Sequence, residues 1–473
     1  MNSPRMSPRH IASALGLLLA ASAAVPLVSL ASAPAAQALG AGDYVLFLDG
    51  EVAAAVAGDH GVDATETTSG GINTLTAHLD AEEAAALQGD DRVLAISPNV
   101  EFVANADRIP PAVSRVGADQ PPVSAGTAIG SVTGGIAVID TGVDPHRDYV
   151  VAGGVDCVGP NGYLNDTNGH GTAVAGAAAA ASDGTGIVGT APGARIYSVR
   201  VLDSKLKGTL SGVACGLNWV AQHADELDIR VANMSLGSPG ADDGNCGRTD
   251  GDVLHQAICT IVAAGVVPVA AAGNNATDFA GQVPASYDEV LTATNVVDFD
   301  GKPGRLATQA PCGTPNVDDT AAVASNYAVS AADIAHTVAA PGECPFATLK
   351  GGRYGYIQSG TSMSAAVTAG VVLDCMQAGQ PCAGLPPAQV IQTIRASAAA
   401  VGPQNGFVGD PYAQDGAKYR GHVVTTSFVA APPAGEPTTT PAPTTTPAPT
   451  TTPAPTTTPA PTTTPAPTTT PAP

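Results

Sequence analysis

Apolar runs alternate with helix-like stretches through most of the chain, from about residue 108 to residue 430. Runs such as GGIAVID, ARIYSVRVLD, IRVANMSL and VVPVAAAG are almost continuously apolar, which is typical of parallel strands buried on both faces. Stretches such as TAVAGAAAAA, LSGVACGLNWVAQHADEL and MSAAVTAGVVLDCMQ have helical composition and separate these runs. This order predicts an α/β fold with a doubly wound, mostly parallel sheet, helices on both faces, and a functional crevice at the carboxyl ends of the strands.

Both ends of the chain differ in composition from this region. Residues 1–38 begin with the basic MNSPRMSPRH, continue into an apolar run and offer small-residue cleavage sites at Ala33 and Ala38, which indicates a secretory signal peptide. An uncleaved membrane anchor is the alternative, and Pro26 within an Ala- and Ser-rich run disfavours it. Residues 432–473 are dominated by TTTPAP repeats that cannot form a core, so we expect a disordered, semi-rigid stalk there.

The charge and the cysteines limit the partners and the cell compartment. The chain of 473 residues has 19 Lys and Arg against 41 Asp and Glu, a net charge of -22, which argues against nucleic acid or an anionic membrane as a partner. It has 8 cysteines and no C-x-x-C motif, which favours structural disulfides in an exported protein. The spacing suggests the pairs Cys246–Cys259 and Cys375–Cys382, while the remaining connectivity stays open.

A separate small unit is expected between residues 39 and 107. It offers a strand-like YVLFLD, an acidic-started helical stretch LDAEEAAALQGD and a second strand-like stretch VLAISPNVEFVA. These residues alone fit any small α+β module in which strands flank a helix. The predicted domains are residues 1–38, 39–107, 108–431 and 432–473.

An aspartate, a histidine and a serine, the residue types that together can activate a serine nucleophile, lie where predicted strands end or predicted helices begin. Asp140 ends GGIAVID, His170 lies between two glycines in NGHGTAVAG, and Ser362 lies in SGTSMSAAVTAG. A serine hydroxyl needs an imidazole to take its proton and a carboxylate to orient that imidazole. Taken one at a time, these residues have simpler interpretations: a turn aspartate, a histidine in a glycine-rich turn and a helix N-cap serine.

The three motifs together resemble those of the subtilisin-like serine peptidase family. AVIDTGVD, GHGTAVAG and SGTSMSAA are similar to its catalytic signatures and follow the same chain order. The resemblance implies a subtilisin-like fold and a serine endopeptidase with Asp140, His170 and Ser362 as its catalytic triad. It also implies polypeptide substrates and chemistry that requires no cofactor.

The resemblance extends to the substrate cleft. ANMSLG resembles the family's substrate-binding strand, which implies that Ser235, Leu236 and Gly237 pair their backbone with an extended substrate. VPVAAAGNNA resembles the strand beside the primary specificity pocket, and Asn274 takes the place of the asparagine that stabilises the oxyanion. A roomy pocket that accepts larger apolar side chains is then expected to be lined by Ala271, Ala272 and Gly273.

Further expectations come from the same resemblance. Residues 39–107 resemble a propeptide that acts as folding template and intramolecular inhibitor, with processing between Ala104 and Ala112. Asp148 and Asp183 fall where many family members bind a structural calcium, and solvated loop acids are the alternative. The mature protein is expected to be a secreted monomer, with the stalk available for cell-wall or surface association.

Two positions depart from the family pattern, and two other functions stay open. Ala173 stands where most members have a second histidine, and Ala366 stands where they have a proline; neither position supplies a reacting group. The alternatives are a catalytically impaired binding protein displayed on its stalk, and a cell-surface structural protein whose tail is its main function. No zinc site is predicted, because no ligand spacing is evident for His146, His255 and His336.

Overall fold

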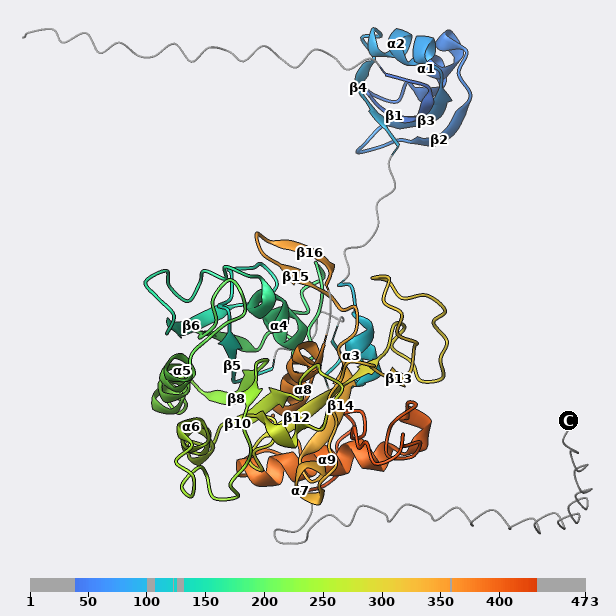
Figure 1. Ribbon diagram of the computed structural model, residues 1–473. Helices are drawn as coiled ribbons and strands as arrows, with labels where there is room; N and C mark the ends of the chain where they lie inside the picture. Colours follow the sequence, from blue (N-terminus) through green and yellow to red (C-terminus); the bar gives the residue numbers. More distant parts are fainter. Residues whose placement is uncertain (1–38, 100–106, 122, 126–131, 358–359, 432–473) are drawn as a thin grey trace, which may run out of the picture. The chain divides into compact units, whose positions relative to one another are not determined.

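The computed structural model describes residues 39–99, 107–121, 123–125, 132–357 and 360–431 (Figure 1). The predicted signal peptide, the predicted stalk and part of the predicted processing region lie outside the described residues. The chain divides into two compact units at Ala104, and each unit is described by itself below. Within the described residues, no helix combines the length and apolarity that a membrane span requires.

The smaller unit is a four-stranded antiparallel sheet with two helices, in strand order β2-β3-β1-β4. Alternate residues of the two central strands pack against both helices, which forms one small core. The strand, helix and strand that the sequence predicts here correspond to β1, α2 and β4, whereas the prediction named no element for α1, β2 and β3. The elements are β1 (Gly42–Leu48), α1 (Ala53–His60), β2 (Ala64–Thr68), β3 (Thr74–Leu79), α2 (Ala81–Gln88) and β4 (Val93–Pro98).

The larger unit is built on an eight-stranded sheet in the order β13-β12-β10-β8-β5-β7-β6, with β14 also paired to β12. All of these pairs are parallel except that of β13 with β12. This arrangement confirms the predicted doubly wound, mostly parallel α/β sheet. The strands are β5 (Gly135–Asp140), β6 (Val151–Asp156), β7 (Arg195–Arg200), β8 (Ile229–Met234), β10 (Val267–Ala271), β12 (Leu291–Val297), β13 (Thr320–Ala321) and β14 (Thr337–Pro341).

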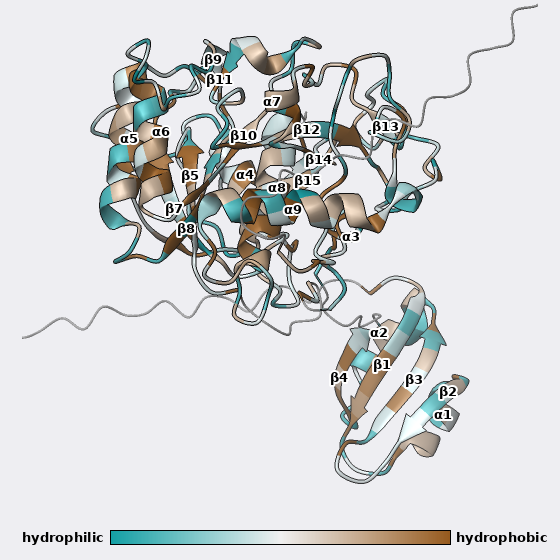
Figure 2. Cartoon of the chain, turned by 90° about the horizontal axis from the view of Figure 1, so that it is seen from below, coloured by the Kyte–Doolittle hydropathy of each residue, from teal (hydrophilic) through white to brown (hydrophobic). Residues whose placement is uncertain are grey.

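Helices cover both faces of this sheet, as central strands with buried residues on both faces require (Figure 2). Along β5, Ile136 and Val138 belong to the core formed with α4, α8 and α9, whereas Ala137 and Ile139 belong to the core formed with α5 and α6. The alternation follows from the two-residue period of a strand. The helices are α3 (Pro111–Arg115), α4 (His170–Ala179), α5 (Leu210–His223), α6 (Val253–Ala263), α7 (Ala331–Ile334), α8 (Thr361–Cys375) and α9 (Pro387–Val401).

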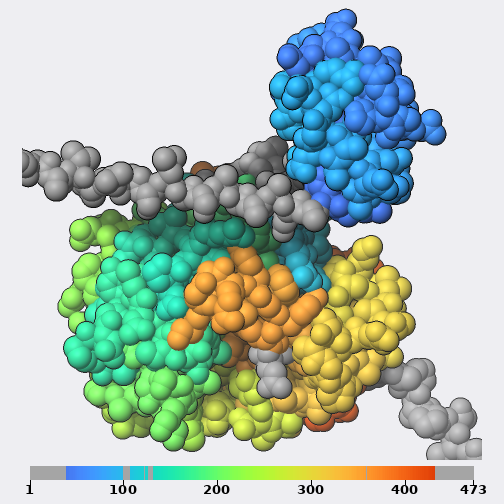
Figure 3. Space-filling view, turned by 90° about the horizontal axis from the view of Figure 1, so that it is seen from above, coloured from blue at the N-terminus to red at the C-terminus, as the bar shows by residue number. Residues whose placement is uncertain are grey.

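Two pairs of short antiparallel strands and the disulfides complete the larger unit. β9 (Ser238–Pro239) pairs with β11 (Gln282–Val283), and β15 (Phe346–Leu349) pairs with β16 (Arg353–Tyr356). The β15–β16 hairpin lies at the surface, in orange in Figure 3, and β15 packs against α4. The disulfides are Cys157–Cys215, Cys246–Cys259, Cys312–Cys344 and Cys375–Cys382, which confirms both predicted pairs.

Helix α8 runs through the interior and buries nearly all of its residues, including the carboxyl group of Asp374. Neither carboxyl oxygen has a hydrogen-bond partner within the described part of the chain. Burial therefore raises the pKa of Asp374 well above its ordinary value of 3.8. The folded chain keeps a proton at this carboxyl group that the unfolded chain releases as the pH rises.

Asp374→Asn is expected to reduce the loss of stability at alkaline pH. Above pH 3.8 only the unfolded wild-type chain releases this proton, so its free energy of unfolding falls by about 1.4 kcal/mol per pH unit until the folded pKa is reached. Asparagine has nearly the same shape and no such proton, so the variant should be more stable than wild type at about pH 8 and similar at about pH 4. Urea unfolding at both pH values measures the difference. The control is Asp225→Asn at an exposed position, and an unchanged pH dependence in Asp374→Asn would contradict a neutral carboxyl group.

Candidate active site

Three elements bring the predicted acid, base and nucleophile to one edge of the sheet. Asp140 is the last residue of β5, His170 is the first residue of α4, and Ser362 is the second residue of α8. The carboxyl ends of parallel strands and the first turns of the following helices lie at the same edge of such a sheet. His170 and Ser362 line the same cleft, which has a volume of about 860 Å³.

Asp140 and His170 form a hydrogen-bonded pair in which the aspartate is buried and the histidine is partly exposed. Nδ1 of His170 lies 2.9 Å from each carboxylate oxygen of Asp140, whose side chain is fully buried. Burial acts to lower the pKa of His170, and the charge of Asp140 and its hydrogen bond act to raise it; the net effect is a raised pKa. The contact places the Nδ1 proton toward Asp140, so Nε2 of the neutral ring is left as the base.

A buried aspartate that the sequence analysis missed fixes the loop before His170. Oδ1 of Asp166 accepts hydrogen bonds from the Thr141 hydroxyl at 2.8 Å and from the backbone of Asn168 and Gly169 at 3.0 and 2.7 Å. Its Oδ2 accepts from the backbone and hydroxyl of Thr172 at 2.9 and 2.7 Å. The sequence does contain a signal for this role, since Asp166 begins the glycine-containing turn DTNGH. An aspartate at the start of a turn commonly accepts hydrogen bonds from backbone N–H groups two or three residues further along the chain.

Ser362 is linked to the predicted substrate-binding segment. The Ser235 hydroxyl donates to the backbone oxygen of Ser362 at 2.8 Å, and the Asn233 amide donates to the Ser235 hydroxyl at 2.9 Å. The Ser362 hydroxyl itself lies 3.5 Å from the backbone oxygen of Ser235. Among the hydrogen bonds between described residues, none joins His170 Nε2 to Ser362 Oγ, and such catalytic bonds are often loose without substrate.

The side chain of Asn274 is oriented by the residue before Ser362. Its Oδ1 accepts hydrogen bonds from the backbone N–H of Thr361 at 3.0 Å and from the Thr361 hydroxyl at 3.1 Å. Because a backbone N–H can only donate, this contact identifies the amide oxygen and leaves Nδ2 as the donor on the cleft side. Gly360 permits this approach, since a Cβ atom there would lie 2.8 Å from Nδ2.

The structure divides the predicted substrate-binding residues into two groups. Ser235, Leu236 and Gly237 line the cleft together with Asn274. Ala271, Ala272 and Gly273 are not among the residues that line it; Ala271 and Ala272 are buried, and Gly273 lies against the side chain of Asn326. A specificity pocket lined by these three residues stays a prediction.

Apolar side chains from other segments form much of the cleft. They come from the segment after β7, the start of α5, the start of α6 and β11, which are far apart in the sequence. No local pattern marks them, because only the fold brings these loop and helix-end positions together. They are Leu202, Leu206, Leu210, Val213, Leu254 and Val283.

The two predicted calcium ligands make other contacts. Asp148 is buried and accepts hydrogen bonds from the Tyr354 hydroxyl and from the backbone N–H of Ile187, the latter at 3.0 Å. Asp183 accepts from the backbone and hydroxyl of Thr185 in its own turn, at 3.0 and 2.8 Å. Neither side chain belongs to a group of three or more possible metal-binding side chains within the described residues, and a calcium site here stays a prediction.

Comparisons with known proteins show what this chain is similar to. The model of the subtilase family matches residues 135–420. "Alkaline elastase YaB" of Bacillus sp. (strain YaB) is 31% identical over 300 residues, which are 63% of this chain and 68% of that protein. "Minor extracellular protease Epr" of Bacillus subtilis (strain 168) is 40% identical over 162 residues, which are 34% of this chain and 23% of that protein. A crystal structure of a cold adapted subtilisin-like serine proteinase covers 68% of this chain and 99% of its own, with a TM-score of 0.48 and 27% identity.

The family match confirms the resemblance inferred from the three motifs. It spans more than half of the chain and includes Asp140, His170 and Ser362. The chain therefore belongs to the subtilase family of serine endopeptidases.

Proposed function

We propose that the chain is a secreted serine endopeptidase in which Ser362 is the nucleophile, His170 the general base and Asp140 the residue that orients His170. The observation that carries this proposal is the hydrogen-bonded Asp140–His170 pair at 2.9 Å, with Ser362 and His170 in the same cleft. Subtilases need no cofactor for catalysis, and the chemistry proposed here uses side chains and water alone.

The proposed reaction begins when Nε2 of His170 takes the proton of the Ser362 hydroxyl. The serine oxygen attacks the peptide carbonyl, the protonated His170 then donates to the leaving amine, and water hydrolyses the acyl-enzyme by the same route. Asp140 stays ionised and stabilises the imidazolium that forms.

Asn274 is proposed to stabilise the oxyanion. Thr361 occupies its amide oxygen, so its Nδ2 group is positioned in the cleft beside Ser362 before substrate arrives. Together with the backbone N–H of Ser362, this amide would donate to the negatively charged oxygen of the tetrahedral intermediate. A donor that needs no reorientation stabilises the transition state more than the substrate.

The substrate is proposed to be an extended polypeptide with apolar side chains near the scissile bond. Ser235, Leu236 and Gly237 line the cleft and follow β8 directly, so their backbone is placed to pair with an extended chain. Leu206 and Leu210 are about half exposed at 48% and 52%, which is the exposure expected of side chains that contact a ligand.

The smaller unit is proposed to act as a propeptide that inhibits the enzyme until it is removed. Residues 39–107 lie between a predicted signal peptide and the catalytic unit, and the chain divides at Ala104 into separate compact units. Secretion is supported by the signal-like residues 1–38, by the disulfides and by the similarity to "Minor extracellular protease Epr". The catalytic domain is proposed to span residues 108–431, followed by the stalk at 432–473.

A serine-directed phosphonate tests the function. We expect it to modify one residue of the secreted protein, Ser362, and peptide mass mapping locates the adduct. Ser362→Ala should not be labelled, and His170→Ala should be labelled far more slowly, because the hydroxyl has lost its base. A wild-type protein that stays unlabelled would favour the catalytically impaired binding protein.

N-terminal sequencing tests the proposed removal of the propeptide. The secreted wild-type protein should start between Ala104 and Ala112, whereas Ser362→Ala should keep its propeptide.

A further inference from the structure

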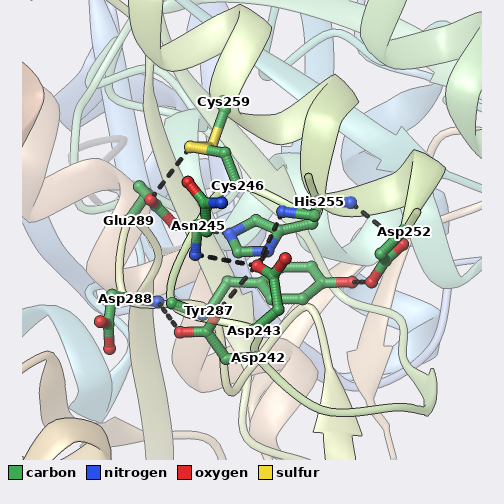
Figure 4. Close-up of polar contacts among 12 residues, drawn as sticks. Asp242, Asp243, Asn245, Cys246, Asp252, His255, Cys259, Tyr287, Asp288 and Glu289 are labelled. Atoms are coloured by element: carbon green, nitrogen blue, oxygen red, sulfur yellow. Dashed lines mark hydrogen bonds and ion pairs between the residues drawn. A yellow bond between two sulfur atoms is a disulfide. The ribbon is translucent and has the colours of Figure 1, made fainter. Parts of the chain in front are cut away.

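A second cluster of polar groups lies beside the active-site cleft, at the start of α6 (Figure 4). His255 is in the first turn of this helix and only 1% exposed. Asp242 and Asp243 come from the loop before α6, and Glu289 comes from the segment that precedes β12. The loop and one separate segment thus place three carboxylates around one buried imidazole.

The contacts of His255 determine which ring nitrogen carries the proton. Nε2 lies 2.8 Å from the Glu289 carboxylate, a distance at which the ring donates and the carboxylate accepts. In the neutral ring this leaves an unprotonated Nδ1 with its lone pair. The ring stacks on Tyr287 with centroids 4.0 Å apart and an interplanar angle of 6°, which restricts its rotation.

Nδ1 of His255 is directed at the two loop aspartates. It lies 3.4 Å from Oδ1 of Asp242 and 3.3 Å from Oδ1 of Asp243, and it has no hydrogen-bond partner among the described residues. These separations exceed the usual hydrogen-bond range of about 2.7–3.2 Å. Two ligands bound at about 2.0–2.1 Å to a tetrahedral ion lie about 3.3–3.4 Å apart, which is the separation found here.

The aspartates are held in place by the loop backbone. Asp243 accepts hydrogen bonds from the backbone N–H groups of Asn245, Gly247 and Thr249, at 2.9, 2.8 and 2.8 Å. Asp242 accepts from the backbone of Gly244 at 2.8 Å and from the backbone of Asp288 at 3.4 Å. A carboxylate has about four lone-pair sites, so the two bonds of Asp242 and the three bonds of Asp243 leave each side chain at least one site for an ion.

The negative charge of the three carboxylates exceeds the positive charge that His255 can supply. Among the ion pairs of the described residues, Asp242, Asp243 and Glu289 pair only with His255. Even a doubly protonated imidazole would leave two negative charges in a partly buried site, which is unfavourable. A dication that replaces the Nδ1 proton would reduce this excess.

We propose that Asp242, Asp243 and His255 bind a transition-metal dication of the Zn²⁺ class. The ligands are Nδ1 of His255 and one oxygen from each aspartate, with water at the fourth position. Glu289 is the outer carboxylate that accepts from the other ring nitrogen and orients the imidazole, as in many metal sites. An imidazole ligand favours this class over Ca²⁺, which binds oxygen.

The nearby sulfur atoms are excluded as ligands. Cys246 and Cys259 form a disulfide, and a disulfide sulfur is not the thiolate that Zn²⁺ binds. The disulfide instead joins the loop to α6, so the proposed ion and the disulfide restrain the same loop. Gly240, Asp252 and Leu254 at the ends of this loop line the active-site cleft, so the ion would stabilise one side of the cleft without entering the reaction.

Thermal unfolding of the full-length Ser362→Ala protein tests the site, because this background prevents self-digestion. After chelator treatment, Zn²⁺ is expected to raise the Tm, whereas Mg²⁺ is not. Asp242→Asn should abolish this rise, and Glu289→Gln should weaken Zn²⁺ binding about 10–100-fold. The matched control is Asp250→Asn, which removes an equal charge from an aspartate of the same loop that bonds only to the backbone N–H of Asp252 among the described residues.

Cobalt absorption gives a second measurement that does not depend on unfolding. Co²⁺ bound to the Ser362→Ala protein should show the intense visible bands of a tetrahedral ion, without a thiolate charge-transfer band, and Asp242→Asn should lose them. The proposal is overturned if Zn²⁺ and Co²⁺ do not bind, if Asp242→Asn and Asp250→Asn respond equally, or if a thiolate band appears. If neither ion binds, the cluster is simply the His255 ring surrounded by carboxylates.

Discussion

Ser362→Ala is expected to lower kcat about 10⁶-fold, the loss measured when the corresponding serine of subtilisin, a relative of this chain, is removed. The acyl-enzyme cannot form without the hydroxyl, although the cleft and Asn274 stay in place. A residual rate of about 10³–10⁴-fold over water is expected from the remaining groups. Hydrolysis of a chromogenic peptide with an apolar residue before the scissile bond measures both rates.

A second serine of the same helix gives the control. Ser364 is buried two residues further along α8, and its hydroxyl lies 3.4 Å from the side-chain oxygen of Asn295. Ser364→Ala should keep most of the activity, because its hydroxyl does not line the cleft. Asn274→Ala in the Ser362→Ala background should reduce the residual rate further. A Ser362→Ala protein with near wild-type kcat would refute Ser362 as the nucleophile.

Asp140→Asn is expected to lower kcat about 10⁴-fold, by imposing the wrong tautomer on His170. The backbone N–H of Thr141 donates to Oδ1 of Asp140 at 2.7 Å, and an asparagine oxygen would keep this bond. Because His170 Nδ1 lies 2.9 Å from both carboxylate oxygens, the asparagine NH₂ would stand beside Nδ1 in place of Oδ2 and would favour the tautomer in which Nδ1 accepts. The ring proton would move to Nε2, and the ring would have no lone pair for Ser362.

The pH dependence separates this effect from simple destabilisation. Activity requires neutral His170, so kcat/KM rises with pH through the pKa of His170, which lies above its ordinary value of 6.5 in the wild type. Asp140→Asn removes the charge that raises this pKa, so the acid limb should move to lower pH. Asp156→Asn at the end of β6 is the control, because Asp156 also bonds to backbone N–H groups after a strand. An equal loss of kcat in both variants would contradict a specific role for Asp140.

The sequence predicted the parts of the fold that depend on local composition. β5 and β10 are almost entirely apolar, and β7 and β8 are buried at all but one position each, so none of the four shows the polar alternation of a strand with one exposed face. The motif residues were placed correctly at strand ends and helix starts, because glycine and turn residues mark those positions. The two short-range disulfides followed from spacing for the same reason.

Features that depend on distant segments could not be predicted in this way. Cys157–Cys215 and Cys312–Cys344 join residues 58 and 32 positions apart, and spacing does not indicate which distant cysteines meet. The motif around Ala271 predicts a strand, but it does not show which side chains of that strand are buried in the core and which line the cleft. His255 has no local ligand spacing, because its acidic neighbours come from a loop before α6 and a segment after it.

The position of α8 in the interior of the fold matters during biosynthesis. The ribosome makes Asp140 and His170 early, whereas Ser362 lies 127 residues beyond Ser235, to which it is hydrogen-bonded. Helix α8 packs against α4, β8, β10 and β12, so its place in the interior exists only after those segments have been synthesised. A nascent or truncated chain that lacks this helix also lacks Ser362, the proposed nucleophile, so we expect incomplete copies of the chain to have no peptidase activity.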